Sequence, residues 1–321
     1  MMKTKLTFYM IIITGTLITI SSENWLSMWM GMEVNMMSFV PLINLSPSKS
    51  SAEASMIYFL TQSISSIIML SIIMLIMMSY KNHIMFMILT MSIMIKLGSA
   101  PFHMWIPKIM NVMSWNNNII FMTWQKISPL YLLNMIEWNY LMNISIILSV
   151  MLGSYGGLYQ TSMRKIMAYS SISHLGWIMS LNKLKDCWVI YLTIYSLMVI
   201  IMCNYLMNSD LLYINQMFNV NMSNSQKMNI VIMMMSLGGM PPMLGFLPKW
   251  MVIEELMNNK SFVMIMFMVM MSMLTLFFYM RMTIKLMMFQ TMINKWDKYN
   301  MEYSMIMFIM NLMLPISVTM Y

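Results

Sequence analysis

Long apolar runs follow one another along almost the whole chain, separated by short polar stretches. A helix of about 20 apolar residues is long enough to cross a bilayer. The runs that we interpret as spans cover residues 6–22, 24–45, 53–79, 84–106, 117–135, 141–159, 166–182, 187–207, 227–257, 261–289 and 302–320. The pattern predicts an all-α polytopic membrane protein with about eleven transmembrane helices.

The scarcity of charge excludes other classes. The chain has 18 Lys and Arg and 10 Asp and Glu, which is 28 of its 321 residues, and 60% of its residues are hydrophobic. So few charges could not cover the surface of a soluble enzyme. The longest polar stretch, residues 208–227, is interpreted as a loop. We therefore expect a single transmembrane domain over residues 1–321.

Basic residues are distributed unevenly between the two sides of the expected bundle. The N-terminal side collects Lys3, Lys5, Lys49, Lys108, Arg164, Lys165, Lys227, Lys295 and Lys298, and the other side collects Lys81, Lys183, Lys185 and Lys260. Loops rich in Lys and Arg stay on the electrically negative side of a membrane. The N-terminus is therefore predicted on that side and the C-terminus on the opposite one.

Four charged residues lie inside the apolar runs: Glu33, Lys96, Lys126 and Lys249. A charge at the centre of a membrane helix costs about 2.5–3.5 kcal/mol, so these side chains should face protein or water. Structural ion pairs are one explanation, but three lysines cannot all pair with one carboxylate. Because burial favours the neutral form of a lysine, such a group can take up and release protons. We favour a proton relay over structural pairing alone.

Two histidines, His103 and His174, also lie within or close to apolar runs. A lone histidine is more often a satisfied core residue than a functional group. In the company of buried charges, however, both are candidates for proton transfer. We interpret His83, at the edge of a run, as structural.

Two of the runs contain glycine and proline beside a buried lysine. The helix breaks are expected at Gly98, Pro101, Gly239, Pro241, Pro242 and Pro248. Proline removes a backbone donor, and within lipid a broken helix survives only where protein or a wet cavity surrounds it. One break alone would be a kink. Two breaks, next to Lys96 and Lys249, indicate inverted repeats with two discontinuous helices around an ion path.

No cofactor or metal site is predicted from the residues. Cys187 and Cys203 are interpreted as buried thiols, because two cysteines cannot hold an iron–sulfur cluster. Gly153, Gly156 and Gly157 are interpreted as a short polar break between helices rather than as a nucleotide-binding loop.

Five motifs carry a resemblance to a known family. They are GMEVNMMSFVPLI, KLGSAPFHMWIP, TWQKISPL, GLYQTSMRKIMAYSSISHLGW and SLGGMPPMLGFLPKW, in this order over about residues 15–290. Together they resemble the antiporter-like membrane subunits of respiratory complex I, NADH:ubiquinone oxidoreductase. The length is similar to that of the animal mitochondrial form. The 57 methionines are similar to the load of proteins from mitochondrial genomes that read AUA as methionine.

The resemblance implies roles for individual residues. By motif, Glu33 and Lys96 correspond to the family's glutamate–lysine pair, Lys126 to its central lysine and Lys249 to its terminal lysine. His174 aligns with a histidine of the S-S-I-x-H-x-G-W motif. These matches imply that the chain moves protons from the mitochondrial matrix to the intermembrane space.

The resemblance also implies a setting. The chain is expected in the mitochondrial inner membrane as an enzyme subunit with no redox chemistry of its own. NADH, FMN, iron–sulfur clusters and ubiquinone then belong to other subunits. Expected partners are the neighbouring antiporter-like subunit, small core membrane subunits and a lipid such as cardiolipin, and not nucleic acid. A stand-alone cation/proton antiporter and a purely structural membrane subunit are the alternatives.

Overall fold

The computed structural model describes residues 2–44, 48–78, 82–181, 187–218 and 224–288. Within these ranges the regular elements are helices, together with one isolated β-bridge between Ser162 and Tyr213. The all-α prediction is confirmed for this part of the chain. The expected last span, residues 302–320, lies outside the described residues.

Four of the described helices are long and apolar enough to cross a membrane. They are α3 (Lys49–Met77), α8 (Tyr140–Leu158), α10 (Cys187–Asn208) and α13 (Phe262–Met288). Shorter apolar helices are α1 (Met2–Ser21), α4 (His83–Leu97) and α11 (Asn224–Gly238). The length and composition of these helices agree with a multipass membrane protein.

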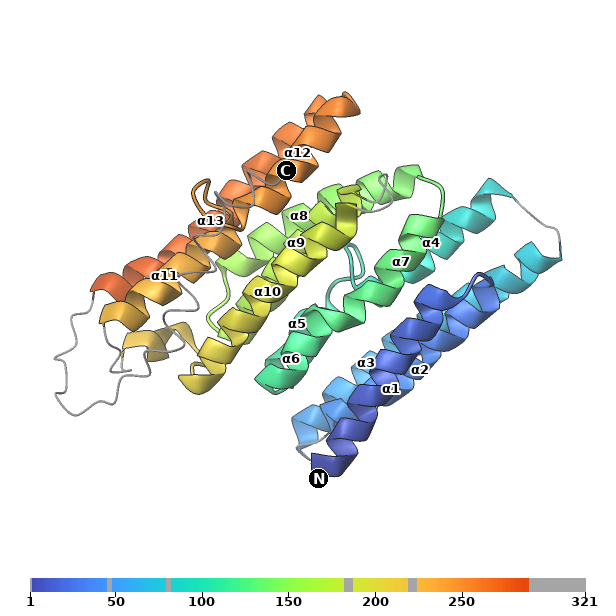
Figure 1. Ribbon diagram of the computed structural model, residues 1–321, viewed down its shortest axis with the longest axis horizontal. Coiled ribbons are helices and arrows are strands. Elements are labelled where there is room, and N and C mark those ends of the chain that lie inside the picture. The colour runs from blue at the N-terminus through green and yellow to red at the C-terminus, as the bar shows by residue number, and fades with distance from the viewer. Residues whose placement is uncertain (1, 45–47, 79–81, 182–186, 219–223, 289–321) are drawn as a thin grey trace. The chain divides into compact units, whose positions relative to one another are not determined.

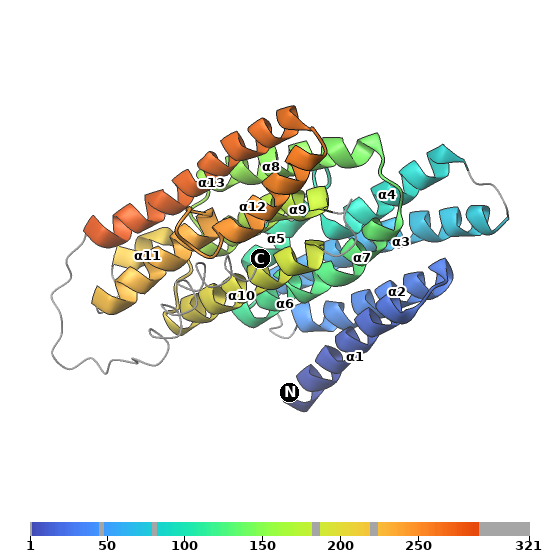
Figure 2. The same ribbon diagram turned by 45° about the horizontal axis from the view of Figure 1, so that its top comes forward.

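The chain divides into two compact units, residues 1–149 and residues 150–321. In the first unit, α1 packs along α2 (Trp25–Ile43), and α2 also packs on α3 (Figures 1 and 2). A Cβ atom at Gly31 would lie 2.8 Å from the carbonyl oxygen of Gly15. Small residues at such a contact let two helix backbones approach closely, which is how membrane helices commonly pack.

The rest of the first unit contains several short elements. After α4 come α5 (Trp105–Val112), α6 (Trp115–Met122), the 3₁₀ segment η1 (Trp124–Lys126) and α7 (Ile127–Met135). The span expected over residues 84–106 thus divides into α4, a turn and the start of α5. The span expected over residues 117–135 divides around η1.

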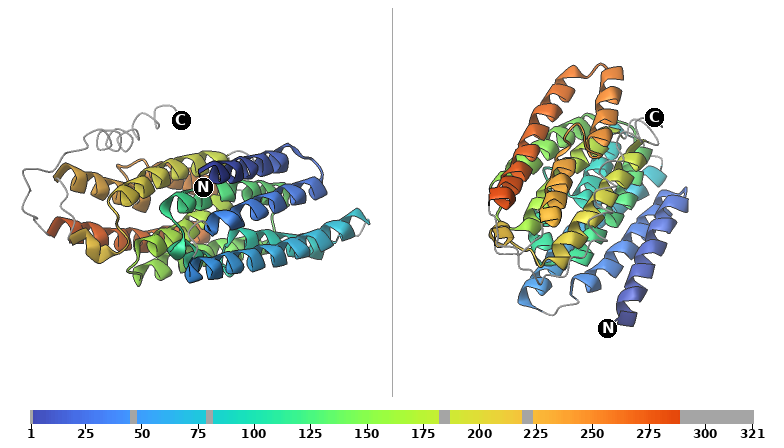
Figure 3. Two further views of the ribbon diagram at one scale, coloured as in Figure 1. Left: turned by 90° about the horizontal axis from the view of Figure 1, so that it is seen from below. Right: turned by 60° about the vertical axis from the view of Figure 1, so that its left-hand side comes forward.

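In the second unit, α9 (Met163–Ser180) is buried along most of its length. It contacts α10 and α12 (Phe246–Asn258), while α13 packs along α11 (Figure 3). The apolar stretch 227–257 divides between α11 and α12. The loop expected over residues 208–227 is shorter than predicted, because it contains the 3₁₀ segment η3 (Ile214–Phe218) and α11 begins at Asn224.

The polar break predicted at Gly153, Gly156 and Gly157 is wrong, because all three glycines lie inside α8. Their role is close packing. A Cβ atom at Gly153 would lie 2.6 Å from the Ser173 backbone nitrogen, and one at Gly156 would lie 2.2 Å from the Tyr169 ring. Gly153 and Gly156 therefore let α8 approach α9 rather than end the helix.

Candidate functional site

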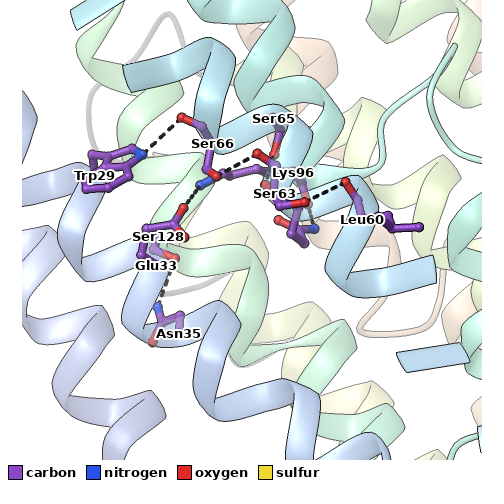
Figure 4. Close-up of polar contacts among 10 residues, drawn as sticks. Trp29, Glu33, Asn35, Leu60, Ser63, Ser65, Ser66, Lys96 and Ser128 are labelled. Carbon is purple, nitrogen blue, oxygen red and sulfur yellow. Dashed lines mark hydrogen bonds and ion pairs between the residues drawn. The ribbon is translucent and has the colours of Figure 1, made fainter. Parts of the chain in front are cut away.

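The first cluster of the site is an ion pair between α2 and α4. The Lys96 amine lies 3.5 Å from Oε1 of Glu33 (Figure 4). Both side chains are withdrawn from the surface, with 4% of the lysine and 19% of the glutamate exposed. The structure therefore brings together two of the charges that the sequence places inside apolar runs.

The end of α4 positions Lys96. The lysine lies in the last turn of the helix, where the partial negative charge of the terminal carbonyl groups favours a cation. Gly98 ends the helix in the left-handed region, with φ 67°. A side chain there would be strained and would also collide with Ile106, since a Cβ atom would lie 2.2 Å from its Cδ1. On the other side, the Gln62 side chain of α3 donates to the Lys96 carbonyl oxygen at 3.2 Å.

A small cavity of about 30 Å³ adjoins Lys96. Its polar lining consists of Asn35, Tyr58, Gln62, Lys96, Gln125 and Ser128. Nδ2 of Asn35 donates to the Ser128 hydroxyl at 3.4 Å, which ties α2 to α7 at the cavity wall. A water molecule needs about 10–15 Å³ and two to four polar partners, so this cavity has room and partners for about two waters.

Lys126 lies at the end of η1, next to the same cavity along the chain. The side chain is buried, with 4% of the residue exposed, and its neighbours Gln125 and Ser128 line the cavity. A 3₁₀ turn between two α-helices often marks a functional hinge. Trp124 anchors this turn by donating from its indole nitrogen to the Thr16 hydroxyl at 3.2 Å.

His103, also in the first unit, has a local partner. It lies in the turn between α4 and α5, and its Nδ1 is 3.2 Å from the Pro101 carbonyl oxygen. This contact supports a role in shaping the turn, and it does not link His103 to the Glu33–Lys96 pair.

The second cluster of the site lies in the second unit, where Lys249 occupies the first turn of α12. Its amine donates to the Gly238 carbonyl oxygen at 2.7 Å. The same amine is 5.8 Å from the ring centroid of Trp177, within cation–π range. Lys249 is 5% exposed. Lys96 contacts a carboxylate, whereas Lys249 contacts a carbonyl at the C-terminus of α11 and the aromatic ring of Trp177 on α9.

The turn between α11 and α12 shapes this lysine site. Gly239 has φ 80°, and a Cβ atom there would lie 2.7 Å from the Lys249 amine. Pro241 and Pro242 lie in the turn, while Pro248 lies in the first turn of α12, where a missing backbone donor is tolerated. A glycine is therefore needed at position 239 for the backbone and for the space that the amine occupies.

His174 of α9 lies in the interior of the second unit. Its Nδ1 is 2.9 Å from the Tyr191 hydroxyl of α10, and its ring lies 4.8 Å from the Tyr195 ring centroid. His174 and Trp177 are three residues apart on one helix, so they share a face. The histidine thus lies one turn along α9 from the aromatic ring that Lys249 approaches.

Sequence reasoning missed the uncharged members of both clusters. The cavity beside Lys96 is lined by Gln62, Asn35 and Ser128. In the second unit, Tyr191 contacts His174, and Trp177 contacts Lys249. In the sequence, each of these residues appears only as a polar or amphipathic side chain inside an apolar run. Such side chains are common in membrane helices, so the sequence signal is weak. Among the residues that the structure describes, no group of three or more His, Cys, Asp or Glu could hold a metal ion.

Comparisons of the sequence with known proteins find one family. Residues 22–275 match the family model described as NADH:quinone oxidoreductase/Mrp antiporter, transmembrane. The NADH-ubiquinone oxidoreductase chain 2 of Anopheles gambiae is 41% identical over 322 residues, covering 95% of this chain and 93% of the relative. The protein of the same name from Locusta migratoria is 38% identical, covering 86% and 83%.

Solved structures share the fold. A chain of respiratory complex I from Thermus thermophilus, solved with bound aureothin, superposes with a TM-score of 0.84 at 17% identity, covering 97% of this chain and 78% of that one. A chain of the Mrp complex of a Dietzia species superposes with a TM-score of 0.78 at 16% identity, covering 91% and 62%. At these identities the likeness concerns the fold alone.

Proposed function

The chain belongs to the NADH:quinone oxidoreductase/Mrp antiporter transmembrane family, and from that premise we propose that it is a proton-translocating membrane subunit of an NADH:ubiquinone oxidoreductase. Protons would move from the mitochondrial matrix to the intermembrane space while other subunits oxidise NADH and reduce quinone. The observation that carries the proposal is the Glu33–Lys96 ion pair, 3.5 Å apart, in which a buried lysine meets a partly buried glutamate beside a polar cavity. The chain is then part of an enzyme without redox chemistry of its own.

The first step of the mechanism is electrostatic. At about 4 Å, two opposite unit charges attract each other by on the order of 4 kcal/mol at an effective dielectric constant near 20. When Glu33 is close, the charged form of Lys96 is favoured, and when Glu33 is drawn away the proton is released. Carrying one charge against 100 mV costs about 2.3 kcal/mol, so the two energies are of similar size. Modulating this pair can therefore drive a proton step.

Lys126 is the next station in the proposed relay. Water in the cavity lined by Gln62, Asn35 and Ser128 would carry the proton from Lys96 toward the η1 turn. We place a hinge at this turn, because a 3₁₀ stretch between α-helices often marks one.

Lys249 completes the relay in the second unit. We propose that α4 with α5, and α11 with α12, are the two discontinuous helices of an inverted repeat, with Gly98 and Gly239 at the interruptions. The amine of Lys249 rests on the freed carbonyl of Gly238 when it is protonated. His174 is a further candidate for proton transfer. We assign His103 to the shape of the first turn, while a relay role remains an alternative for it.

The proposal extends to the setting of the chain. We propose a single transmembrane domain over residues 1–321 with about eleven spans and the N-terminus on the matrix side. NADH, FMN, iron–sulfur clusters and ubiquinone are held by other subunits. The partners are a neighbouring antiporter-like subunit, small core membrane subunits and an anionic lipid such as cardiolipin.

A stand-alone cation/proton antiporter is the second candidate function, and the shared fold with a chain of an Mrp complex favours it. Gentle solubilisation and native electrophoresis distinguish the two. Our proposal predicts that the chain migrates in a large assembly with NADH:ubiquinone activity. Migration of the chain alone, with cation-driven proton exchange after reconstitution, would establish the antiporter instead. A purely structural subunit is tested by Lys126→Met, which in that case would leave proton translocation intact.

A further inference from the structure

The interior of α9 contains polar side chains that are satisfied in two different ways. Ser173 and Ser180 are buried, and each donates its hydroxyl to the carbonyl oxygen three residues earlier in the same helix. His174 differs from them, because its ring nitrogen Nδ1 makes a hydrogen bond to another helix, α10, through the Tyr191 hydroxyl. A bond between helices fixes the orientation of the imidazole ring, which a bond within one helix would not do.

The histidine and its partner are enclosed. His174 is 4% exposed and Tyr191 is fully buried. The ring of Tyr195, from the next turn of α10, lies at 4.8 Å from the imidazole at an interplanar angle of 39°. The face of an aromatic ring carries negative charge density and favours a nearby cation. The surroundings can therefore accommodate both the neutral imidazole and the imidazolium ion.

We propose that Tyr191 is a positioning residue that holds His174 as a proton-carrying station beside Lys249, an inference that rests on the proposed function. The Tyr191 oxygen accepts a hydrogen bond from Nδ1–H of His174. In this tautomer Nε2 carries the ring lone pair that takes up a proton. The imidazolium formed keeps the same Nδ1–H bond, and the proton then leaves from Nε2. The N–H bond at Nε2 forms as an N–H or O–H bond of the donor, the Lys249 ammonium or a water molecule, breaks. It breaks again when the proton passes to the next water molecule, so the step needs no oxidant or reductant.

The position of His174 along α9 supports this step. Trp177, whose ring lies 5.8 Å from the Lys249 amine, follows His174 by three residues, about 4.5 Å along the helix axis. His174 therefore lies on α9 one turn away from Trp177, the residue that the Lys249 amine approaches. Two cations so placed repel each other, and a proton on Lys249 disfavours a second proton on His174. Protons are then passed in turn rather than stored on both groups.

The experiment uses the whole oxidoreductase assembly with Tyr191→Phe in this chain. Phenylalanine keeps the ring and removes the hydroxyl that accepts from Nδ1–H. We expect normal assembly and normal electron transfer with an uncoupler, while proton translocation becomes about tenfold slower, equivalent to about 1.4 kcal/mol. The matched control is Tyr205→Phe, the same change on the same helix, with translocation within about twofold of wild type.

Infrared spectra of histidine-labelled assembly give a readout that a structural role would not change. His174→Gln identifies the bands of His174. One imidazole tautomer is expected in the wild type and in Tyr205→Phe, and a mixture of tautomers in Tyr191→Phe. Unchanged translocation, or an unchanged tautomer signal, in Tyr191→Phe would overturn the inference.

Two further variants keep the outcomes separate. If Tyr191→Phe prevents assembly, His174→Gln is used in its place. Glutamine can still bond to Tyr191 but cannot carry a proton. Normal proton translocation in His174→Gln would overturn the inference. Lys126→Met tests the proposed function itself. If Lys126→Met stops translocation while an assembled Tyr191→Phe translocates normally, the proposed function stands and the role of Tyr191 fails.

Discussion

Glu33 and Lys96 form an ion pair whose members are covered unequally. Their charged atoms are 3.5 Å apart, with 4% of the lysine side chain exposed and 19% of the glutamate side chain. The lysine lines the polar cavity between α2, α3 and α7, whereas the glutamate retains contact with the surroundings of the unit. In the proposed relay, Glu33 is therefore the member that responds to an external change of charge, and Lys96 is the member that passes a proton inward.

Glu33→Gln should slow proton translocation by at least about tenfold. The change keeps the size of the side chain and removes the charge that favours protonated Lys96. Loss of even a third of an attraction of about 4 kcal/mol corresponds to a factor of about ten in rate. The measurement is proton uptake into vesicles that contain the purified assembly, monitored with a pH-sensitive dye.

The control for this variant is Glu23→Gln, because Glu23 is an exposed glutamate before the start of α2. It should translocate protons like the wild type. Equal effects of the two substitutions would show that the ion pair has no special role.

Gly239→Ala should displace Lys249 and destabilise the turn between α11 and α12. The left-handed conformation costs a residue with a side chain about 1–2 kcal/mol. The new methyl group would also lie 2.7 Å from the amine, against the position that Lys249 now occupies. We expect faster thermal inactivation together with slower proton translocation.

Gly238→Ala is the matched control for this substitution. A Cβ atom at Gly238 meets its nearest neighbour at 3.5 Å, which is ordinary van der Waals contact. The Gly238 carbonyl that receives the Lys249 amine is kept. An equal loss of translocation in both variants would contradict the assigned role of Gly239.

Gln62→Leu should impair translocation by drying the cavity beside Lys96. The substitution removes a polar wall of the cavity and the hydrogen bond to the Lys96 carbonyl oxygen. Leaving a buried polar group without its partner costs about 1–3 kcal/mol. A high-resolution map of the assembly should show ordered water next to Lys96 in the wild type and none there in the variant.

Met36→Leu changes the apolar wall of the same cavity and serves as the control. Because it keeps the wall apolar and similar in volume, both water and translocation should be retained. Retention of water in Gln62→Leu, with normal translocation, would rule out this route for the proton.

Charged residues were the part of the site that the sequence could predict. Glu33 and Lys96 stand out in apolar runs because an isolated charge in lipid is costly, and the structure pairs them. The αL glycines at positions 98 and 239 also left a clear signal, since glycine and proline are conspicuous beside a buried lysine. A charge or a helix-breaking residue raises the free energy of an apolar helix. Such a residue is therefore conspicuous in the amino-acid sequence, because its presence needs a compensating role.

Other features had no comparable cost and remained hidden. Gln62 and Tyr191 have neutral side chains that many membrane helices contain, so their role appears only when a partner from another helix is in place. The predicted polar break at Gly153 is wrong, because composition does not distinguish a loop glycine from one that lets two helices touch. The 3₁₀ turn at Lys126 likewise depends on packing.

The central claim, that buried charges in this chain carry protons, is tested most directly by Lys126→Met. Methionine fills the buried position without a titratable group. The measurement is the number of protons translocated per NADH oxidised by the purified, fully assembled variant in sealed vesicles. A proton relay predicts a clear fall in this ratio with assembly unchanged. A ratio equal to that of the wild type would contradict the relay and favour a structural subunit.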